Sequence, residues 1–346
     1  MAAIDRKSSG RRAEVVAITG ASAGVGRAVA REFASRGASV GLIARGLKGL
    51  EGARHEVEEE GGKALVLPTD VSDPDQVEQA ASEIESALGP IDLWVNNAMT
   101  TVFSPFLDMP ADEYRRVTEV AYLGYVHGTM AALRRMVPRD RGVIVQVGSG
   151  VGYRGIPLQS AYSGAKHAIK RLTDSIRTEL RHDRSRVWVT MVHLPSVNTL
   201  QFSWAKARIP QRPRPFRPVF QPEMAARAIY WAAHHRRREI FVGPAAAFVN
   251  LNKVMPGFLD LYFARWGFWS QMYDGPPGVD RRDYLWEPVD EDRGAHGDFD
   301  AEARDANAQL WLSLHGRTVA AAAGLVACGA LAARALAARG GRTRAG

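Results

Sequence analysis

The sequence has only one cysteine, Cys328, among its 346 residues. A single cysteine cannot form an internal disulfide, and cysteine and histidine nowhere recur at the spacing of a metal site. The sequence therefore predicts a protein of a reducing compartment without a structural metal. The first residues are polar and basic and lack the apolar run of a secretory signal, which favours a cytoplasmic location.

The sequence also lacks the features of a nucleic-acid-binding protein. Its 45 Lys and Arg against 37 Asp and Glu give a net charge of +8. Four of the positive charges lie close together near the C-terminus, at Arg334, Arg339, Arg342 and Arg344. We find neither a recognition motif nor a basic face interleaved with aromatic residues. The basic balance is partly a property of the tail, and no nucleic-acid partner is expected.

The sequence does contain short apolar, β-branched runs that alternate with helical patterns. Seven such runs predict strands, at residues 15–19, 40–44, 64–70, 93–98, 143–149, 187–195 and 239–243. Strands that alternate with helices predict an α/β fold with a doubly wound, parallel sheet covered on both faces. Ligands of such sheets bind at the carboxyl ends of the strands.

A glycine-rich segment, TGASAGVG, lies directly between the first predicted strand and an amphipathic helix. Glycine turns at this junction let the backbone approach a pyrophosphate and direct helix N–H groups toward it. A tight turn alone would also use glycines, but the strand and helix context favours a dinucleotide site. The residues expected to contact the nucleotide are Gly20, Ser22, Gly24, Val25 and Gly26.

The second predicted strand ends in Ala44-Arg45, where a site for NAD would place an acid against the ribose 2′-hydroxyl. No acid follows before Glu51, and Arg45 could pair with a 2′-phosphate, which favours NADP(H). The alternative is a surface arginine at a strand end. Asp70 and Asn97 follow the third and fourth strands at the same edge. They could hold adenine and fix the turn beneath the cofactor, or serve as ordinary loop caps.

Tyr162 and Lys166 are four residues apart in a helical stretch, so their side chains share one face. Ser149 ends the fifth predicted strand. Hydride transfer to a carbonyl requires a proton for the developing alkoxide, and an ammonium nearby would lower the pKa of a tyrosine donor. A serine hydroxyl could hold the carbonyl oxygen. A Tyr–Lys pair is common on helix surfaces, but together with Ser149 and the nucleotide motif it predicts an oxidoreductase that interconverts a carbonyl and an alcohol.

Taken together, these motifs resemble those of the short-chain dehydrogenase/reductase family over about residues 12–245. The likeness includes TGASAGVG, Asp70, NNA at 96–98, Ser149, the Tyr162 and Lys166 pair, and LPSVNT at 194–199. The resemblance implies a single Rossmann-like domain, strand order 3-2-1-4-5-6-7 and a homo-oligomer. It also implies that Lys166 bonds the nicotinamide ribose and that the segment with Pro195, Val197 and Thr199 contacts the nicotinamide amide.

The sequence departs from the family pattern at two positions. Met99 replaces a glycine beside the expected cofactor. Ala121 stands where the family has an asparagine that holds a proton-relay water, and Thr118 and Tyr122 are candidates to bind a substitute. A second hypothesis therefore stays open, a catalytically weakened NADP(H)-binding sensor or scaffold. The retained catalytic residues favour the active enzyme, because a binding module needs no proton donor.

The chain is expected to divide into five segments. These are a polar tail at 1–12, the Rossmann-like domain at 13–275, a polar linker at 276–316, an apolar helix at 317–338 and a basic tail at 339–346. The apolar helix is either a weak membrane anchor or a soluble helix that packs on the domain or a partner.

Within the domain, a proline-rich lid is expected at about 200–222 and an aromatic-rich extension at about 250–275. Their aromatic side chains favour either an apolar pocket for a lipophilic alcohol or ketone, or an interface. They are Phe216, Phe220, Phe258, Tyr262, Phe263, Trp266 and Trp269.

Overall fold

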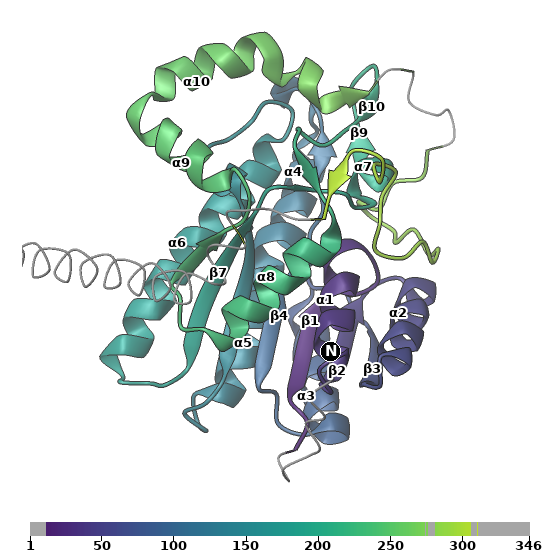
Figure 1. Cartoon of the computed structure of the whole chain (residues 1–346), viewed down its shortest axis with the longest axis vertical. Helices are drawn as coiled ribbons and strands as arrows, with labels where there is room; N and C mark the ends of the chain where they lie inside the picture. Colours follow the sequence, from purple (N-terminus) through teal and green to yellow (C-terminus); the bar gives the residue numbers. More distant parts are fainter. Residues whose placement is uncertain (1–11, 274, 276–280, 306–309, 311–346) are drawn as a thin grey trace, which may run out of the picture. The chain divides into compact units, whose positions relative to one another are not determined.

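The computed structural model describes residues 12–273, 275, 281–305 and 310. Seven parallel strands form its central sheet, in the order β12-β7-β6-β4-β1-β2-β3 (Figure 1). They are β1 Val15–Thr19, β2 Ser39–Ala44, β3 Lys63–Pro68, β4 Leu93–Asn96, β6 Val143–Ser149, β7 Trp188–Leu194 and β12 Glu239–Phe241. The predicted doubly wound parallel fold and its strand order are confirmed.

Helices cover both faces of this sheet (Figure 1). On one face α1 (Gly24–Ala34) packs against α8 (Pro222–His234) and α2 (Leu47–Glu59). On the other face α3 (Pro74–Leu88) packs against α5 (Gly124–Met136), and α6 (Ser160–His182) packs against α4 (Ala111–Thr118). Because both faces are covered, β1 and β2 are buried along their whole length, which is why they are apolar without alternation.

The regular alternation stops after β7, at the segment predicted as a lid. It contains β8 Ser196–Val197, α7 Gln201–Trp204, β9 Lys206–Ala207, β10 Arg212–Pro213 and β11 Val219–Phe220. These short strands pair with β5 (Val102–Phe103), β13 (Met272–Tyr273) and β14 (Ala303–Arg304). The extension consists of α9 (Ala245–Val254), α10 (Pro256–Tyr262) and a π turn at Phe263–Gly267.

Residues 281–305 fold onto the domain, although the sequence predicts a polar linker over 276–316. Leu285 is fully buried in an apolar cluster with Val117 and Ala121. Asp292 pairs with the buried guanidinium of Arg27. The acidic composition of this segment suggested solvation, but some of its carboxylates are partners for cations of the domain. The compact unit that contains the sheet ends at Asp305.

The segments predicted at 317–338 and 339–346, together with Cys328, lie outside the described residues. Among the residues that the structure describes, no helix is both long and apolar enough to span a membrane. The same residues contain no group of three or more His, Cys, Asp and Glu side chains that could hold a metal ion.

Candidate functional site

Two adjoining pockets lie at the carboxyl ends of the strands. The first, which we call the glycine pocket, has a volume of about 210 Å³ and is lined by Gly20, Ser22, Gly24, Val25, Arg45 and Asp70, among others. The second, the tyrosine pocket, has a volume of about 360 Å³ and is lined by Ser149, Tyr162, Lys166, Pro195 and Val197, among others. Asn97, Met99 and Thr199 line both pockets. The structure thus brings nearly all predicted site residues to one edge of the sheet.

The glycine motif forms a turn that leaves no room for a side chain at Gly20 or Gly26. A Cβ on Gly26 would lie 2.1 Å from the carbonyl oxygen of Gly20, and Gly20 itself has a left-handed φ of 69°. The Asn97 side-chain amide donates to the carbonyl oxygens of Thr19 at 3.0 Å and Gly20 at 3.3 Å. Asn97 therefore fixes the turn, and the open backbone can approach a phosphate group.

Arg45 lines the glycine pocket, and its guanidinium contacts residues 281–305. It donates to the carbonyl oxygen of Trp286 at 2.7 Å and to that of Tyr284. The Tyr284 phenol in turn donates to the Met99 sulfur, at 3.7 Å, between the two pockets. The sequence did not indicate these contacts, because the carbonyls belong to a segment about 240 residues away, whose composition suggested a linker.

Asp70 is a charged acceptor beside Arg45. Burial tends to raise the pKa of its carboxyl, but hydrogen bonds from Arg116 and Ser72 outweigh burial and hold the pKa below its usual value. Arg116 is itself buried and donates to the carbonyl of Leu285 at 3.1 Å. The guanidinium groups of Arg45 and Arg116 therefore both face the Asp70 carboxylate, and Arg116 is a residue that sequence reasoning missed.

The tyrosine pocket holds Ser149, Tyr162 and Lys166 together. The Ser149 hydroxyl and the Tyr162 phenol line the same pocket, and Ser149 lowers the pKa of the phenol. The Lys166 ammonium nitrogen lies 5.6 Å from the centroid of the Tyr162 ring. Because β6 ends at Ser149 and α6 begins two residues before Tyr162, the sheet edge and the first turns of one helix position all three side chains.

The pKa of Tyr162 is raised, although the sequence led us to expect that Lys166 lowers it. Burial is the main cause, and the neighbouring Ser149 hydroxyl offsets it only in part. The ammonium nitrogen of Lys166 instead donates to the phenol of Tyr125 at 2.7 Å and to the carbonyl of Val147 at 2.8 Å. Burial also lowers the pKa of Lys166 to about 7.

Tyr125 is the most important residue of the site that the sequence did not reveal. It is 1% exposed, and its phenol donates to the Val147 carbonyl at 3.0 Å while it accepts from Lys166. Burial raises its pKa well above the usual value, so the phenol stays protonated. Thr118, a candidate for a substitute relay, donates its hydroxyl to the Tyr114 carbonyl of its own helix at 2.9 Å. Tyr125 follows Ala121 by four residues, and residues at this spacing share one helix face. This spacing was the one signal in the sequence that pointed to Tyr125 as part of the site.

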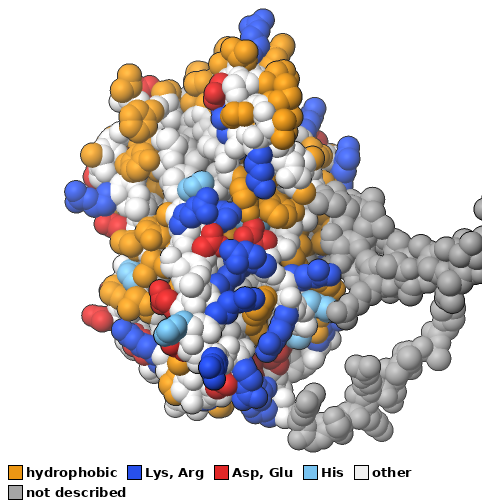
Figure 2. All heavy atoms as spheres, turned by 90° about the vertical axis from the view of Figure 1, so that its left-hand side faces the viewer, with side chains coloured by type: hydrophobic (Ala, Val, Ile, Leu, Met, Phe, Trp, Pro, Cys, Tyr) orange, Lys and Arg blue, Asp and Glu red, His pale blue; other side chains and the backbone are white. Residues whose placement is uncertain are grey.

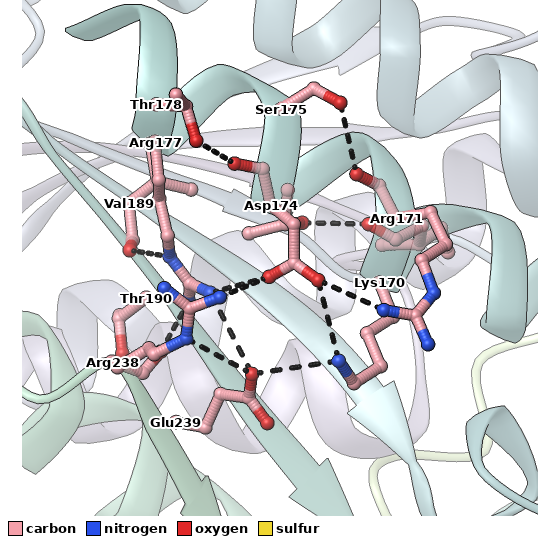
Figure 3. Close-up of polar contacts among 12 residues, drawn as sticks. Lys170, Arg171, Asp174, Ser175, Arg177, Thr178, Val189, Thr190, Arg238 and Glu239 are labelled. Atoms are coloured by element: carbon pink, nitrogen blue, oxygen red, sulfur yellow. Dashed lines mark hydrogen bonds and ion pairs between the residues drawn. The ribbon is translucent and has the colours of Figure 1, made fainter. Parts of the chain in front are cut away.

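A cluster of charges fixes α6 to strands β7 and β12 (Figure 3). Asp174 of α6 pairs with Arg177 and Arg238, and Glu239 of β12 faces the same two guanidinium groups. Lys170 lies 3.4 Å from Asp174 and 3.9 Å from Glu239. Since several of these groups are largely buried, the pairs hold the helix that carries Tyr162 and Lys166 in register with the sheet.

The aromatic residues of the lid and the extension divide into three sets. Phe216, Tyr262 and Phe263 line the tyrosine pocket. Phe220 is buried in the domain. Phe258, Trp266 and Trp269 are 52%, 55% and 64% exposed. The lid and the extension therefore contribute apolar walls to the pocket, while part of the extension faces outward.

Comparisons with known proteins agree with this geometry. The profile of the family described as short chain dehydrogenase matches residues 14–207. The chain is 32% identical over 277 residues to the Bacillus subtilis protein named "Uncharacterized oxidoreductase YxnA", covering 79% of this chain and 78% of that protein. It is also 33% identical over 193 residues to a 3-dehydrosphinganine reductase of Danio rerio, covering 54% of this chain and 58% of that protein.

Solved structures show the same similarity. An alcohol dehydrogenase from Thermococcus sibiricus, complexed with 5-hydroxy-NADP, superposes with a TM-score of 0.58 at 26% identity over 67% of this chain and 96% of that chain. A short chain dehydrogenase/reductase from Burkholderia phymatum, in complex with NAD, superposes with a TM-score of 0.65 at 25% identity over 72% of this chain and 95% of that chain.

Proposed function

The chain belongs to the short-chain dehydrogenase/reductase family, an oxidoreductase family with NADP-bound and NAD-bound members, and from this premise we propose that it is an active NADP(H)-dependent enzyme that interconverts a carbonyl and an alcohol. The observation that supports activity most strongly is that Ser149, Tyr162 and Lys166 line one pocket, which adjoins the glycine pocket. A protein that merely binds the nucleotide needs neither Ser149 nor Tyr162.

Ser149, Tyr162 and Lys166 each have a distinct role in the proposed reaction. When bound, the nicotinamide supplies or takes up the hydride. The Ser149 hydroxyl donates to the carbonyl oxygen, and the Tyr162 phenol gives its proton to the developing alkoxide. The raised pKa of Tyr162 keeps the phenol protonated at neutral pH, which suits reduction. Lys166, held by Tyr125 and Val147, places a positive charge beside the Tyr162 ring.

Replacing Tyr162 tests the catalytic assignment. In a screen of lipophilic carbonyls with NADPH, Tyr162→Phe should remove turnover, because the proton donor is lost. NADPH affinity should stay nearly unchanged, since the proposed role of the phenol lies with the substrate proton. A variant that kept most of the parent's turnover on a verified substrate would contradict the proton-donor role.

The preference for NADP(H) is supported by Arg45, which lines the glycine pocket. We expect NADPH to bind at least about tenfold better than NADH, or about 1.4 kcal/mol, because a guanidinium can pair with the 2′-phosphate. In calorimetric titrations Arg45→Ala should remove most of that ratio, while Arg54→Ala, at an exposed arginine of α2, should keep it. The ratio of NADPH affinity to NADH affinity is the decisive quantity. Loss of the Arg45 contacts to Tyr284 and Trp286 alone would weaken the binding of both nucleotides alike. Equal affinities in the parent would refute the preference.

The substrate is proposed to be a lipophilic ketone or alcohol. Apolar side chains from the lid and the extension, including Phe216, Phe248 and Phe263, line the tyrosine pocket. The similarity to a 3-dehydrosphinganine reductase supports a substrate with a long apolar chain. Turnover restricted to small hydrophilic carbonyls would contradict this assignment.

A second candidate is the catalytically weakened NADP(H)-binding sensor or scaffold. It is favoured by Ala121, which is fully buried in an apolar cluster with Leu285 and Val117. Its signature would be tight NADPH binding together with carbonyl turnover that does not depend on Tyr162.

A further inference from the structure

The extension is apolar on two opposite sides. Leu259, Phe263 and Gly267 recur every four residues, are buried and pack the extension on the domain. The other side is exposed and equally apolar, with Val254 at 79%, Leu261 at 73% and Trp269 at 64% exposure. A helix at the surface of a globular protein normally places polar residues there. This outer side, formed by the exposed apolar residues of 251–269, is called the outer face below.

The outer face has the composition of a segment that lies at a lipid–water boundary. It carries Phe258, Tyr262, Trp266 and Trp269. Figure 2 shows hydrophobic side chains gathered at the top of the molecule, over α9 and α10. Tryptophan and tyrosine prefer the headgroup region of a bilayer, where an apolar ring and a polar edge are both accommodated.

The charges of the extension favour a negatively charged surface. Lys253 and Arg265 are exposed, and the Arg265 guanidinium lies 5.2 Å from the centroid of the Trp266 ring. Asp260 is the single acid in residues 245–273, and its carboxylate pairs with Arg154 of the domain. In a two-fold contact between the extensions of two copies, the single acid of this segment is Asp260, which already pairs with Arg154. Anionic lipid headgroups complement Lys253 and Arg265.

The outer face continues into the tyrosine pocket. Tyr262 is 47% exposed and also lines that pocket, together with Phe248 and Phe263 of the same extension. An apolar molecule in contact with this face therefore has an apolar route to Ser149 and Tyr162.

We propose that the outer face docks on a lipid bilayer that contains anionic headgroups, and that a lipophilic substrate passes from the bilayer into the tyrosine pocket beside Tyr262. The delivery of substrate rests on the proposed function. The docking does not, since it depends only on the exposed side chains and charges of the extension. It is also independent of the predicted C-terminal helix.

Sedimentation of the full chain with vesicles tests the docking without any turnover measurement. The vesicles are phosphatidylcholine alone or phosphatidylcholine with phosphatidylserine. The parent binds the mixed vesicles, and Leu261→Ser with Trp269→Ser lowers its partition coefficient at least about tenfold, or about 1.4 kcal/mol. The matched control is Phe106→Ser with Leu107→Ser, an exposed aromatic–aliphatic pair outside residues 245–273, which binds like the parent.

Several results would overturn the proposal. One is a parent that does not bind the mixed vesicles, and another is equal binding by both double variants and the parent, which would assign the contact to a different part of the chain. A third is self-association that is lost with Leu261→Ser and Trp269→Ser in the absence of vesicle binding. Should the serine variant fail to fold, quenching of tryptophan fluorescence by lipids with brominated acyl chains decides. The fluorescence of the parent is expected to be quenched. If the double variant Trp266→Phe with Trp269→Phe is quenched as strongly as the parent, the docking is overturned.

Discussion

Replacing Tyr125 with phenylalanine is the sharpest test of how the site holds its lysine. The change removes the phenol oxygen that accepts a hydrogen bond from the Lys166 ammonium at 2.7 Å. The ring remains, and with it the 4.4 Å approach of the ammonium nitrogen to the ring centroid. Because the Val147 carbonyl still accepts from Lys166 at 2.8 Å, the variant isolates the contribution of one hydroxyl.

The size of the effect follows from the burial of both partners. Tyr125 is 1% exposed and Lys166 is 2% exposed, so water screens their hydrogen bond little. A hydrogen bond to a charged group contributes about 1.5–3 kcal/mol. If Lys166 loses this much stabilisation in the transition state, kcat falls about 10- to 160-fold. The loss of an acceptor also disfavours the ammonium, so the pKa of Lys166 should fall below its value of about 7.

The assay is steady-state reduction of a verified carbonyl with NADPH, measured across the pH range around neutrality. A reaction that needs the ammonium slows as pH rises through the pKa of Lys166, and in Tyr125→Phe this decline should shift to lower pH. Tyr230→Phe, on α8 and lining neither pocket, is the control and should behave like the parent. A Tyr125→Phe variant with the kcat and the pH profile of the parent would refute the reasoning, whereas a merely structural role would not move the profile.

Two further predictions concern stability. Leu285→Ala should lower the free energy of unfolding by about 2–5 kcal/mol because Leu285 is fully buried. In thermal melts the exposed Trp286→Ala should have a smaller effect, and an unchanged Tm for Leu285→Ala would mean that residues 281–305 are not part of the folded domain. Lys166 has a pKa of about 7 in the folded protein, whereas its ordinary value is 10.5. Its charge therefore destabilises the fold most below pH 7. The free energy of unfolding should rise with pH between these two values, as the folded protein loses this charge. Lys166→Met should therefore raise Tm at pH 7 by about 2 °C or more, which corresponds to about 1 kcal/mol. This increase in Tm should shrink toward pH 10.5. An increase that is independent of pH would contradict the lowered pKa of Lys166.

The sheet could be predicted because its signal is local. Each of the seven strands begins and ends within two residues of an apolar run in the sequence. Parallel strands covered on both faces need continuous apolar runs, and the alternation of such runs with helical patterns indicated the α/β class. The strand order is not visible in any single run, and it came from the family resemblance.

The catalytic residues could be predicted for a similar reason, whereas their environment could not. Tyr162 and Lys166 share a helix face by spacing alone. The partner of Lys166, Tyr125, lies 41 residues away and reaches it only through the packing of α5 beside α6. The expected lowering of the Tyr162 pKa failed for the same reason, since the direction in which an ammonium points depends on its acceptors. Those acceptors belong to other elements of the fold.

Residues 281–305 show where composition misleads. Arg27 on α1 is 3% exposed, and its charge must be balanced inside the protein. Glu56 supplies one carboxylate at 2.9 Å, and Asp292, 265 residues along the chain from Arg27, supplies the second. An acidic segment that looks solvated in the sequence is thus a complement to a buried cation. Because the same segment holds Arg45 through two of its carbonyls, the orientation of the residue proposed to select the 2′-phosphate depends on a part of the chain that lies beyond the family match at 14–207.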